Sequence, residues 1–331
     1  MQHRVVIIGA GRIADVHALS LSRSPALTLA GVVDPFGGAA FSEGWRVPLF
    51  ADLLEAVRET RPAALVIASP TATHVPYILE ACALGLPTLC EKPVAFDRPP
   101  ILEAIAAREA SGVPVILGFH RRFDPSRRAL AERVAAGDVG KIEHLLQMSR
   151  DPQLASRAEV QHQGNIVADM VVHDLDELLW LVGRPPDYAH CFLDRNVDPT
   201  LAEIGDFDTA NILLSWTDGP AAHVTATRRA VHAFEQRLEV FGSDGRIICE
   251  DPRVNTLVFD GARDTRLSRR PAHFYDRYRT AYQAEIDHLA EVLDRGAAPL
   301  CTLQDGLRAF DLVRQVLDAC PAQGDLEQRQ S

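Results

Sequence analysis

The first 118 residues alternate short apolar runs with longer amphipathic segments, and this alternation constrains the fold more than any other feature of the sequence. Five apolar runs predict strands at residues 4–9, 27–34, 63–69, 87–91 and 113–119. The segments between them predict helices, including one over 74–84 that Gly85 would end. Strands that alternate with helices form a parallel, doubly wound sheet, so the chain begins with an α/β domain.

A glycine motif follows the first predicted strand directly. In "VVIIGAGRIADVHAL", Gly9, Gly11 and Ala14 have the spacing of the dinucleotide-binding fingerprint at the start of a predicted helix. The first glycine would allow a tight turn, and the second would let a pyrophosphate approach the backbone. The helix would begin at Arg12 and Ile13, where its amides and partial positive charge favour a diphosphate. These residues predict a dinucleotide site.

An acidic residue at the end of the second predicted strand bears on the choice of cofactor. Asp34 would accept hydrogen bonds from the adenosine ribose and would repel a 2'-phosphate, which predicts NAD rather than NADP. The alternative is a simple turn formed with Pro35 at the end of the strand.

The segment "ASPTATH" follows the third of the long predicted strands. Ligands bind open α/β sheets outside the carboxyl ends of their strands, so we expect Ser69, Thr71 and His74 to contact the cofactor. Thr73 is equally well explained as the cap of the helix that begins near His74.

Lysine is scarce in this chain, and one of the two lysines follows a predicted strand. Of 34 basic residues only Lys92 and Lys141 are lysine, and Lys92 lies in "PTLCEKPVAF" at the same edge of the sheet as the cofactor motif. A partly desolvated amine can donate or relay a proton, which arginine cannot. We therefore interpret Lys92 as catalytic and Glu91 as a neighbour that could orient its ammonium or contact the cofactor. The alternative is an ion pair at a strand end, and Lys141 is expected to be a solvated loop charge.

After about residue 120 the pattern changes to short strands separated by turns. Seven segments predict a mainly antiparallel sheet, at residues 141–150, 188–194, 209–216, 221–230, 235–242, 245–251 and 255–260. Two helical stretches, 168–183 and 277–296, interrupt or flank these strands. We expect two domains, a Rossmann dinucleotide-binding domain over 1–120 and an α+β substrate-binding and oligomerisation domain over 121–331.

Asp169 and His173 are four residues apart in the first of these helical stretches. Residues at this spacing lie one turn apart on the same side of a helix. A carboxylate beside an imidazole favours its protonated form, which suits a base that takes a hydroxyl proton. Such pairs are also common as solvated neighbours, and although the spacing could suit two metal ligands, we expect no metal because no third ligand cluster is placed beside them.

Taken together, the glycine motif, Asp34, "EKP" and "DMVVHDLD" resemble the glucose-fructose oxidoreductase / inositol dehydrogenase / rhizopine catabolism (Gfo/Idh/MocA) family over almost the whole chain. The resemblance implies a Rossmann domain followed by an α/β domain with a large, mainly antiparallel sheet. It also implies that Lys92 lies at the active site, that His173 is the acid/base, and that Asp169 is its partner or binds a substrate hydroxyl. Asp176 would bind another hydroxyl.

Several segments are most similar to inositol 2-dehydrogenases, namely 118–125, 149–152, 169–176 and 274–285. Arg122 and Asp151 in these segments are weaker candidates for substrate binding, because charges in such loops are usually solvated. Three positions depart from the pattern and bear on the identity of the substrate. Gln163 stands where the family often has glycine, Ser149 where some inositol dehydrogenases place histidine, and Phe234 where some place tyrosine.

The predicted function is an NAD-dependent dehydrogenase that oxidises a secondary hydroxyl of a cyclic polyol, an inositol in particular. A related sugar or sugar-derivative dehydrogenase is one alternative. A non-catalytic protein that senses NAD(P) or a sugar on the same fold is another, but it would not need Lys92, Asp169 and His173 together.

The composition agrees with a small-molecule enzyme. A net charge of -11 disfavours nucleic acid and anionic membranes as partners, and the six cysteines lack the Cys-x-x-Cys spacing of a zinc site. No apolar stretch is as long as a membrane span and none precedes Val5, so we expect a cytoplasmic protein. The resemblance implies a homo-oligomer, a tetramer or dimer, formed through the exposed face of the antiparallel sheet.

Overall fold

A computed structural model describes residues 2–154 and 164–320 of the chain. The chain forms two compact units. The first unit contains Met1–Pro125 and Tyr278–Leu307, and the second contains Ser126–Arg277 and Arg308–Ser331. The expected boundary at residue 120 lies close to Pro125, but the expectation of two continuous segments is wrong for residues 278–307, which pack with the first unit.

The first unit is built on a six-stranded parallel sheet with the strand order β3-β2-β1-β4-β5-β6. The strands are β1 (His3–Ile8), β2 (Leu27–Val33), β3 (Leu49–Phe50), β4 (Ala64–Ile67), β5 (Thr88–Glu91) and β6 (Val115–Gly118). The order reverses between β1 and β4, which is the switch point at which doubly wound sheets bind ligands. The five predicted strands are confirmed, and β3 is an additional two-residue strand.

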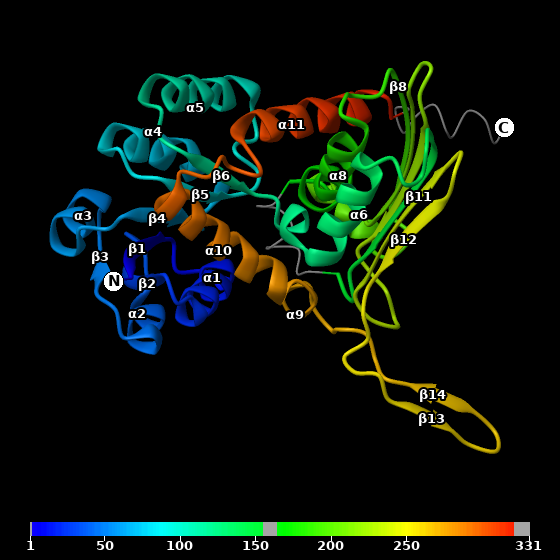
Figure 1. Cartoon of the computed structure of the whole chain (residues 1–331), viewed down its shortest axis with the longest axis horizontal. Helices are drawn as coiled ribbons and strands as arrows, with labels where there is room; N and C mark the ends of the chain where they lie inside the picture. The colour runs from blue at the N-terminus through cyan, green and yellow to red at the C-terminus, as the bar shows by residue number, and fades with distance from the viewer. Residues whose placement is uncertain (1, 155–163, 321–331) are drawn as a thin grey trace. The chain divides into compact units, whose positions relative to one another are not determined.

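Helices connect the strands of this sheet (Figure 1). They are α1 (Arg12–Arg23), α2 (Ala39–Trp45), α3 (Leu53–Thr60), α4 (His74–Leu84) and α5 (Arg98–Ser111), with short 3-10 turns η1 (Thr71–Thr73) and η2 (His120–Phe123). The predicted helix over 74–84 is confirmed, and Gly85 ends it in the left-handed conformation. Most strand positions are apolar and buried because helices cover both faces of a doubly wound sheet.

The helix α10 (Arg279–Arg295) completes the first unit, although it lies far from the other helices in the sequence. It contacts α1 and η2, so its apolar face is buried against two segments that lie more than 150 residues earlier in the chain. Figure 1 shows α10 and α1 side by side.

The second unit is built on a six-stranded mixed sheet with the order β12-β11-β7-β10-β9-β8. The strands are β7 (Ile142–Arg150), β8 (Tyr188–Asp194), β9 (Thr209–Ser215), β10 (Ala221–Thr227), β11 (Glu235–Gly242) and β12 (Arg246–Glu250). All six were predicted, and the sheet is mainly antiparallel as expected, with one parallel pair formed by β7 and β10. The seventh predicted strand, β13 (Val258–Asp260), instead forms a separate hairpin with β14 (Thr265–Leu267).

One face of this sheet is covered by helices and the other is open (Figure 1). The helical elements are α6 (Pro125–Ala135), the π-helical turn η3 (Val167–Val171), α8 (Val172–Val182), η4 (Pro199–Ile204), α9 (Phe274–Arg277) and α11 (Leu303–Asp318), which runs across the division between the units. Strand residues alternate between buried and more exposed positions, as expected for a sheet with one covered face. No helix in the described part of the chain is both long and apolar enough to cross a membrane.

Candidate functional site

The glycine motif forms the turn between β1 and α1. Gly9 has φ +95°, and a Cβ atom there would lie 2.7 Å from the carbonyl oxygen of Ala68, so only glycine fits. A Cβ atom on Gly11 would meet nothing within 4 Å, which leaves room for a ligand against the backbone. Gly11 precedes α1 without capping it through a side chain, so the amides beginning at Arg12 and Ile13 face this space. These features fit a dinucleotide diphosphate.

Asp34 follows β2 and is held by backbone amides. Its Oδ2 accepts a hydrogen bond from the amide of Ala10 at 3.0 Å, and its Oδ1 accepts one from the amide of Phe36 at 3.0 Å. The strand-end turn considered as an alternative is therefore present. It also fixes the carboxylate beside the glycine turn, and each carboxylate oxygen keeps acceptor capacity for a ribose hydroxyl.

The residues after β4 are joined by side-chain hydrogen bonds. The hydroxyls of Ser69 and Thr73 are 2.6 Å apart, and the hydroxyl of Thr73 donates to the carbonyl oxygen of Pro70. Thr73 is the N-cap residue of α4, as the capping alternative expected, but its side chain makes no capping hydrogen bond. His74 is buried, with Nε2 2.8 Å from the carbonyl oxygen of Ser69 and Nδ1 2.8 Å from that of Pro93. Thr71 lies in the intervening 3-10 turn.

Lys92 follows β5, at the carboxyl edge of the sheet, and precedes a cis peptide bond to Pro93. The side chain of Glu91 is nearly buried, and its Oε1 lies 2.7 Å from Nε2 of His17 in α1. The predicted cofactor residues and Lys92 thus belong to the same unit and lie at the carboxyl ends of four neighbouring strands, β2, β1, β4 and β5.

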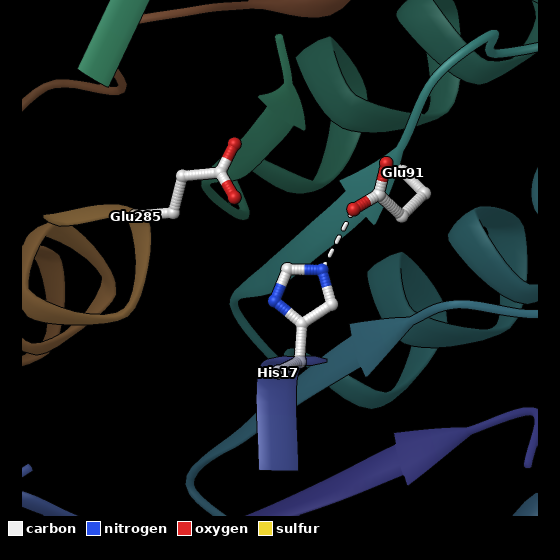
Figure 2. A group of neighbouring side chains, drawn as sticks. All are labelled: His17, Glu91 and Glu285. Carbon is white, nitrogen blue, oxygen red and sulfur yellow. Dashed lines mark hydrogen bonds and ion pairs between the residues drawn. The ribbon is translucent and has the colours of Figure 1, made fainter. Parts of the chain in front are cut away.

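A third residue faces the His17–Glu91 pair. Figure 2 shows the carboxylate of Glu285, from α10, directed toward the other two side chains. Glu285 is fully buried, and neither of its carboxylate oxygens has a hydrogen-bond partner among the described residues. Burial, with a further contribution from Glu91, raises the pKa of Glu285 well above its usual range. Glu285 therefore keeps its proton to a higher pH than an exposed glutamate does.

His17, Glu91 and Glu285 are also of the residue types that bind metals, and their ligand atoms lie within 4.8 Å of one another. Two ligands of one tetrahedral ion at about 2.1 Å would be about 3.3 Å apart. The observed 2.7 Å between His17 and Glu91 is instead a hydrogen-bond distance. The three residues therefore form a buried cluster in which His17 and Glu91 are hydrogen-bonded and Glu285 lies beside them, and the sequence did not indicate this cluster.

Asp169 and His173 lie in the second unit, and Asp169 is paired with an arginine that the sequence analysis missed. Asp169 is in the π-helical turn η3, and His173 is in the first turn of α8. π-Helical turns are rare and often occur at functional sites. Arg228, which is buried after β10, lies 3.3 Å from Oδ2 of Asp169 and 3.2 Å from Oδ2 of Asp206. Asp206 in turn accepts a hydrogen bond from the amide of Ile166, just before η3.

The remaining candidates are mostly buried. Asp176 is buried in α8, whereas Asp151 is half-buried after β7. Arg122 belongs to the first unit, where it is buried and pairs with Asp305 at 3.3 Å, so it is not the solvated loop charge that its position suggested.

Two of the three positions that depart from the family pattern lie in the described part of the chain. Ser149 is fully buried in β7, where its hydroxyl contacts Asp174 at 2.5 Å and Gln236 at 2.6 Å. Phe234 is buried just before β11. Gln163 lies outside the described residues.

Comparisons with known families agree with both units. Residues 3–119 match the model of an oxidoreductase family with an NAD-binding Rossmann fold, and residues 127–248 match the GFO/IDH/MocA C-terminal domain. The uncharacterized oxidoreductase YrbE of Bacillus subtilis is 33% identical over 93% of this chain and 91% of its own length. The chain belongs to the Gfo/Idh/MocA family. It is an NAD-dependent oxidoreductase, and its first unit binds NAD.

Other relatives of this Gfo/Idh/MocA oxidoreductase have named activities. An inositol 2-dehydrogenase of Rhizobium meliloti is 30% identical over 94% of the chain and 95% of that relative. Among solved structures, a myo-inositol dehydrogenase from Corynebacterium glutamicum has a TM-score of 0.90 and 31% identity, with 97% of each chain covered. The fold is therefore shared along the whole described length.

Proposed function

We propose that this oxidoreductase is a polyol dehydrogenase that oxidises a secondary hydroxyl of an inositol to the ketone. The observation that carries the proposal is the similarity to an inositol 2-dehydrogenase at 30% identity over 94% of the chain, with Lys92, Asp169 and His173 all present. A relative that only senses a sugar would not need an amine, a carboxylate and an imidazole together.

In the proposed reaction, His173, Lys92 and Asp169 have separate roles. Bound NAD supplies the acceptor for the hydride that leaves the carbinol carbon. His173 takes the proton of the hydroxyl on that carbon, so it must be neutral at the start of oxidation. The ammonium of Lys92 donates a hydrogen bond to the same oxygen and relays a proton. Asp169 stabilises the imidazolium that forms on His173.

Arg228 gives a physical reason for the position of Asp169. Its buried guanidinium lies 3.3 Å from Oδ2 of Asp169 and can hold this side chain in one orientation. Asp206 pairs with the same arginine and fixes its orientation. We therefore propose that Asp169 is held in place by Arg228.

The experiment that tests this function is a screen of inositol isomers and pyranoses for NADH formation. Lys92→Met should lower kcat by roughly a hundredfold or more while NADH still binds, because a general acid–base group contributes about that much. Lys92→Arg should not restore turnover, since a guanidinium does not release its proton. Lys141→Met is the matched control, because Lys141 is exposed and is the only other lysine.

Three results would contradict the proposal in different ways. NADH binding without turnover of any polyol or sugar would indicate a sensing protein. Turnover of pyranoses but not inositols would indicate a related sugar dehydrogenase. Near-native kcat in Lys92→Arg would show that Lys92 is only a positive charge.

We also propose that the enzyme is a homo-oligomer that covers the open face of the second unit's sheet. Leu146, Leu213 and Ile248 lie in one row across that face and are more than a third exposed. Light scattering should therefore report a dimer or tetramer, and Leu146→Arg with Leu213→Arg should shift it toward monomer. A monomeric wild-type protein would contradict this proposal. The cytoplasmic location stays a prediction.

A further inference from the structure

The two residues that flank Lys92 are each contacted by a buried histidine. On one side, Oε1 of Glu91 is 2.7 Å from Nε2 of His17 (Figure 2). On the other side, the carbonyl oxygen of Pro93 is 2.8 Å from Nδ1 of His74. All five residues belong to the first unit, so these contacts lie within one compact body.

His17 ties the segment before Lys92 to the cofactor helix. It is fully buried on the face of α1 that carries Ala14, Ala18 and Leu21, in the helix that the glycine turn begins. A hydrogen bond from an imidazole to a carboxylate is charge-assisted and stronger than one between neutral groups. The position of Glu91 is therefore coupled to the helix expected to bind the NAD diphosphate.

His74 ties the segment after Lys92 to the loop after β4. Its ring lies between the carbonyl oxygens of Ser69 and Pro93, at 2.8 Å from each. Burial lowers the pKa of His74, and the two carbonyl contacts oppose that shift. The ring therefore lies between two of the loops at the carboxyl edge of the sheet, and because a neutral imidazole has a single N–H, it donates to one of the two carbonyl oxygens at a time.

We propose that His17 and His74 are positioning residues for Lys92. The inference rests on the proposed function of Lys92. An ammonium at the end of four methylene groups can be aimed only if the backbone from Glu91 to Pro93 is fixed. Because a misplacement of about 1 Å can lower the rate about a hundredfold, the two histidines set the efficiency of Lys92 without touching the substrate.

The geometry allows an unusually specific test, because the two contacts use different ring nitrogens. A glutamine amide nitrogen lies near the position of Nε2 of histidine, and an asparagine amide nitrogen lies near Nδ1. His17→Gln therefore keeps the contact with Glu91, and His17→Asn loses it. At position 74 the preference reverses, since His74→Asn keeps the contact with Pro93 and His74→Gln keeps only that with Ser69.

We expect kcat to be at least about tenfold higher for the glutamine variant than for the asparagine variant at position 17, and the reverse at position 74. The NADH dissociation constant and Tm should differ little within each pair. His288→Gln is the control, because His288 is a largely buried histidine that accepts a hydrogen bond from Leu300 and contacts no residue of this segment. Its kcat should equal that of the wild type.

A second measurement needs no substrate. Reductive methylation with 13C-formaldehyde labels lysine amines, and this chain has only Lys92 and Lys141. The titration of the Lys92 signal should shift in His17→Asn and His74→Gln, whereas the Lys141 signal should not move. This result would stand even if no polyol were turned over, so failure of the proposed function is distinguishable from failure of positioning.

Two outcomes would overturn the inference. Equal kcat and equal Lys92 titration for glutamine and asparagine at both positions would show that the histidines only fill space. A fall in Tm with EDTA that zinc reverses would show that His17, Glu91 and Glu285 hold an ion instead of a hydrogen-bonded contact.

Discussion

Replacing Glu285 with glutamine should make the enzyme more stable at neutral and alkaline pH. Glu285 is fully buried and faces His17 and Glu91, with no hydrogen bond to either carboxylate oxygen among the described residues. Burial, then Glu91, raises the pKa of Glu285 well above 4.5. Glutamine has the shape of the protonated carboxyl group but cannot ionise.

The direction of the change in stability with pH follows from proton binding. Above the ordinary glutamate pKa the unfolded chain releases the Glu285 proton, whereas the folded chain retains it until the raised pKa is reached. The folded state therefore binds more protons, and the wild type loses stability as pH rises, by up to about 1.4 kcal/mol per pH unit. Glu285→Gln does not suffer this loss, so above about pH 5.5 the variant should gain on the wild type as pH rises, by up to about 1.4 kcal/mol per pH unit.

The assay is thermal unfolding of both proteins at matched pH values in the absence of ligand. For a unit of this size, 1 kcal/mol corresponds to roughly 2–4 °C in Tm, so the gain is measurable. Asp287→Asn, an exposed change on the same helix, controls for lost charge and should give a Tm difference that does not vary with pH. A constant difference for Glu285→Gln, or a wild type that gains on the variant as pH rises, would refute the reasoning.

Three further predictions concern the cofactor and the reaction. Because Asp34 repels a 2'-phosphate by at least about 1 kcal/mol, kcat/KM should favour NAD over NADP roughly fivefold or more, and equal values would exclude this role. Gly11→Ala should weaken NADH binding with little change in Tm. Gly9→Ala should weaken NADH binding and also lower Tm, since its Cβ atom would lie 2.7 Å from backbone atoms. Calorimetry measures the Tm of both variants, and titration with NADH measures their affinity. Polyol oxidation should rise with pH through one ionisation if His173 must be neutral, and Asp169→Asn should move that ionisation to lower pH. An unchanged pH profile in His173→Ala would remove His173 from the mechanism.

Most of the secondary structure was predictable because it depends on local patterns. Strands buried on both faces read as apolar runs, and strands with one covered face read as alternation. The short β3 was missed because two residues form no pattern. The parallel pairing of β7 with β10 and the packing of α10 on α1 were missed for a different reason. Periodicity shows that a segment has an apolar face, but not which segment covers it.

The residues of the candidate site show the same difference between local patterns and contacts made by distant segments. The glycine motif, Asp34 and Lys92 were found because each lies in a short motif next to a strand end. His17, Glu285 and Arg228 were missed because their partners come from distant segments. A signal existed for two of them. His17 lies between Ala14 and Leu21 on the apolar face of α1, and Glu285 lies on the apolar face of α10. A titratable residue on an apolar helix face needs a partner inside the fold.

Arginine and lysine side chains are used differently in this structure. Four buried ion pairs, between Arg122 and Asp305, Arg127 and Glu177, Arg228 and Asp206, and Arg277 and Asp251, use the guanidinium group. Arginine suits that task because its planar fork presents several donors and stays charged when buried. Where the fold needs a buried positive charge, this sequence therefore supplies arginine. An amine at Lys92 is then best explained by chemistry that a guanidinium cannot perform, which is the loss and gain of a proton.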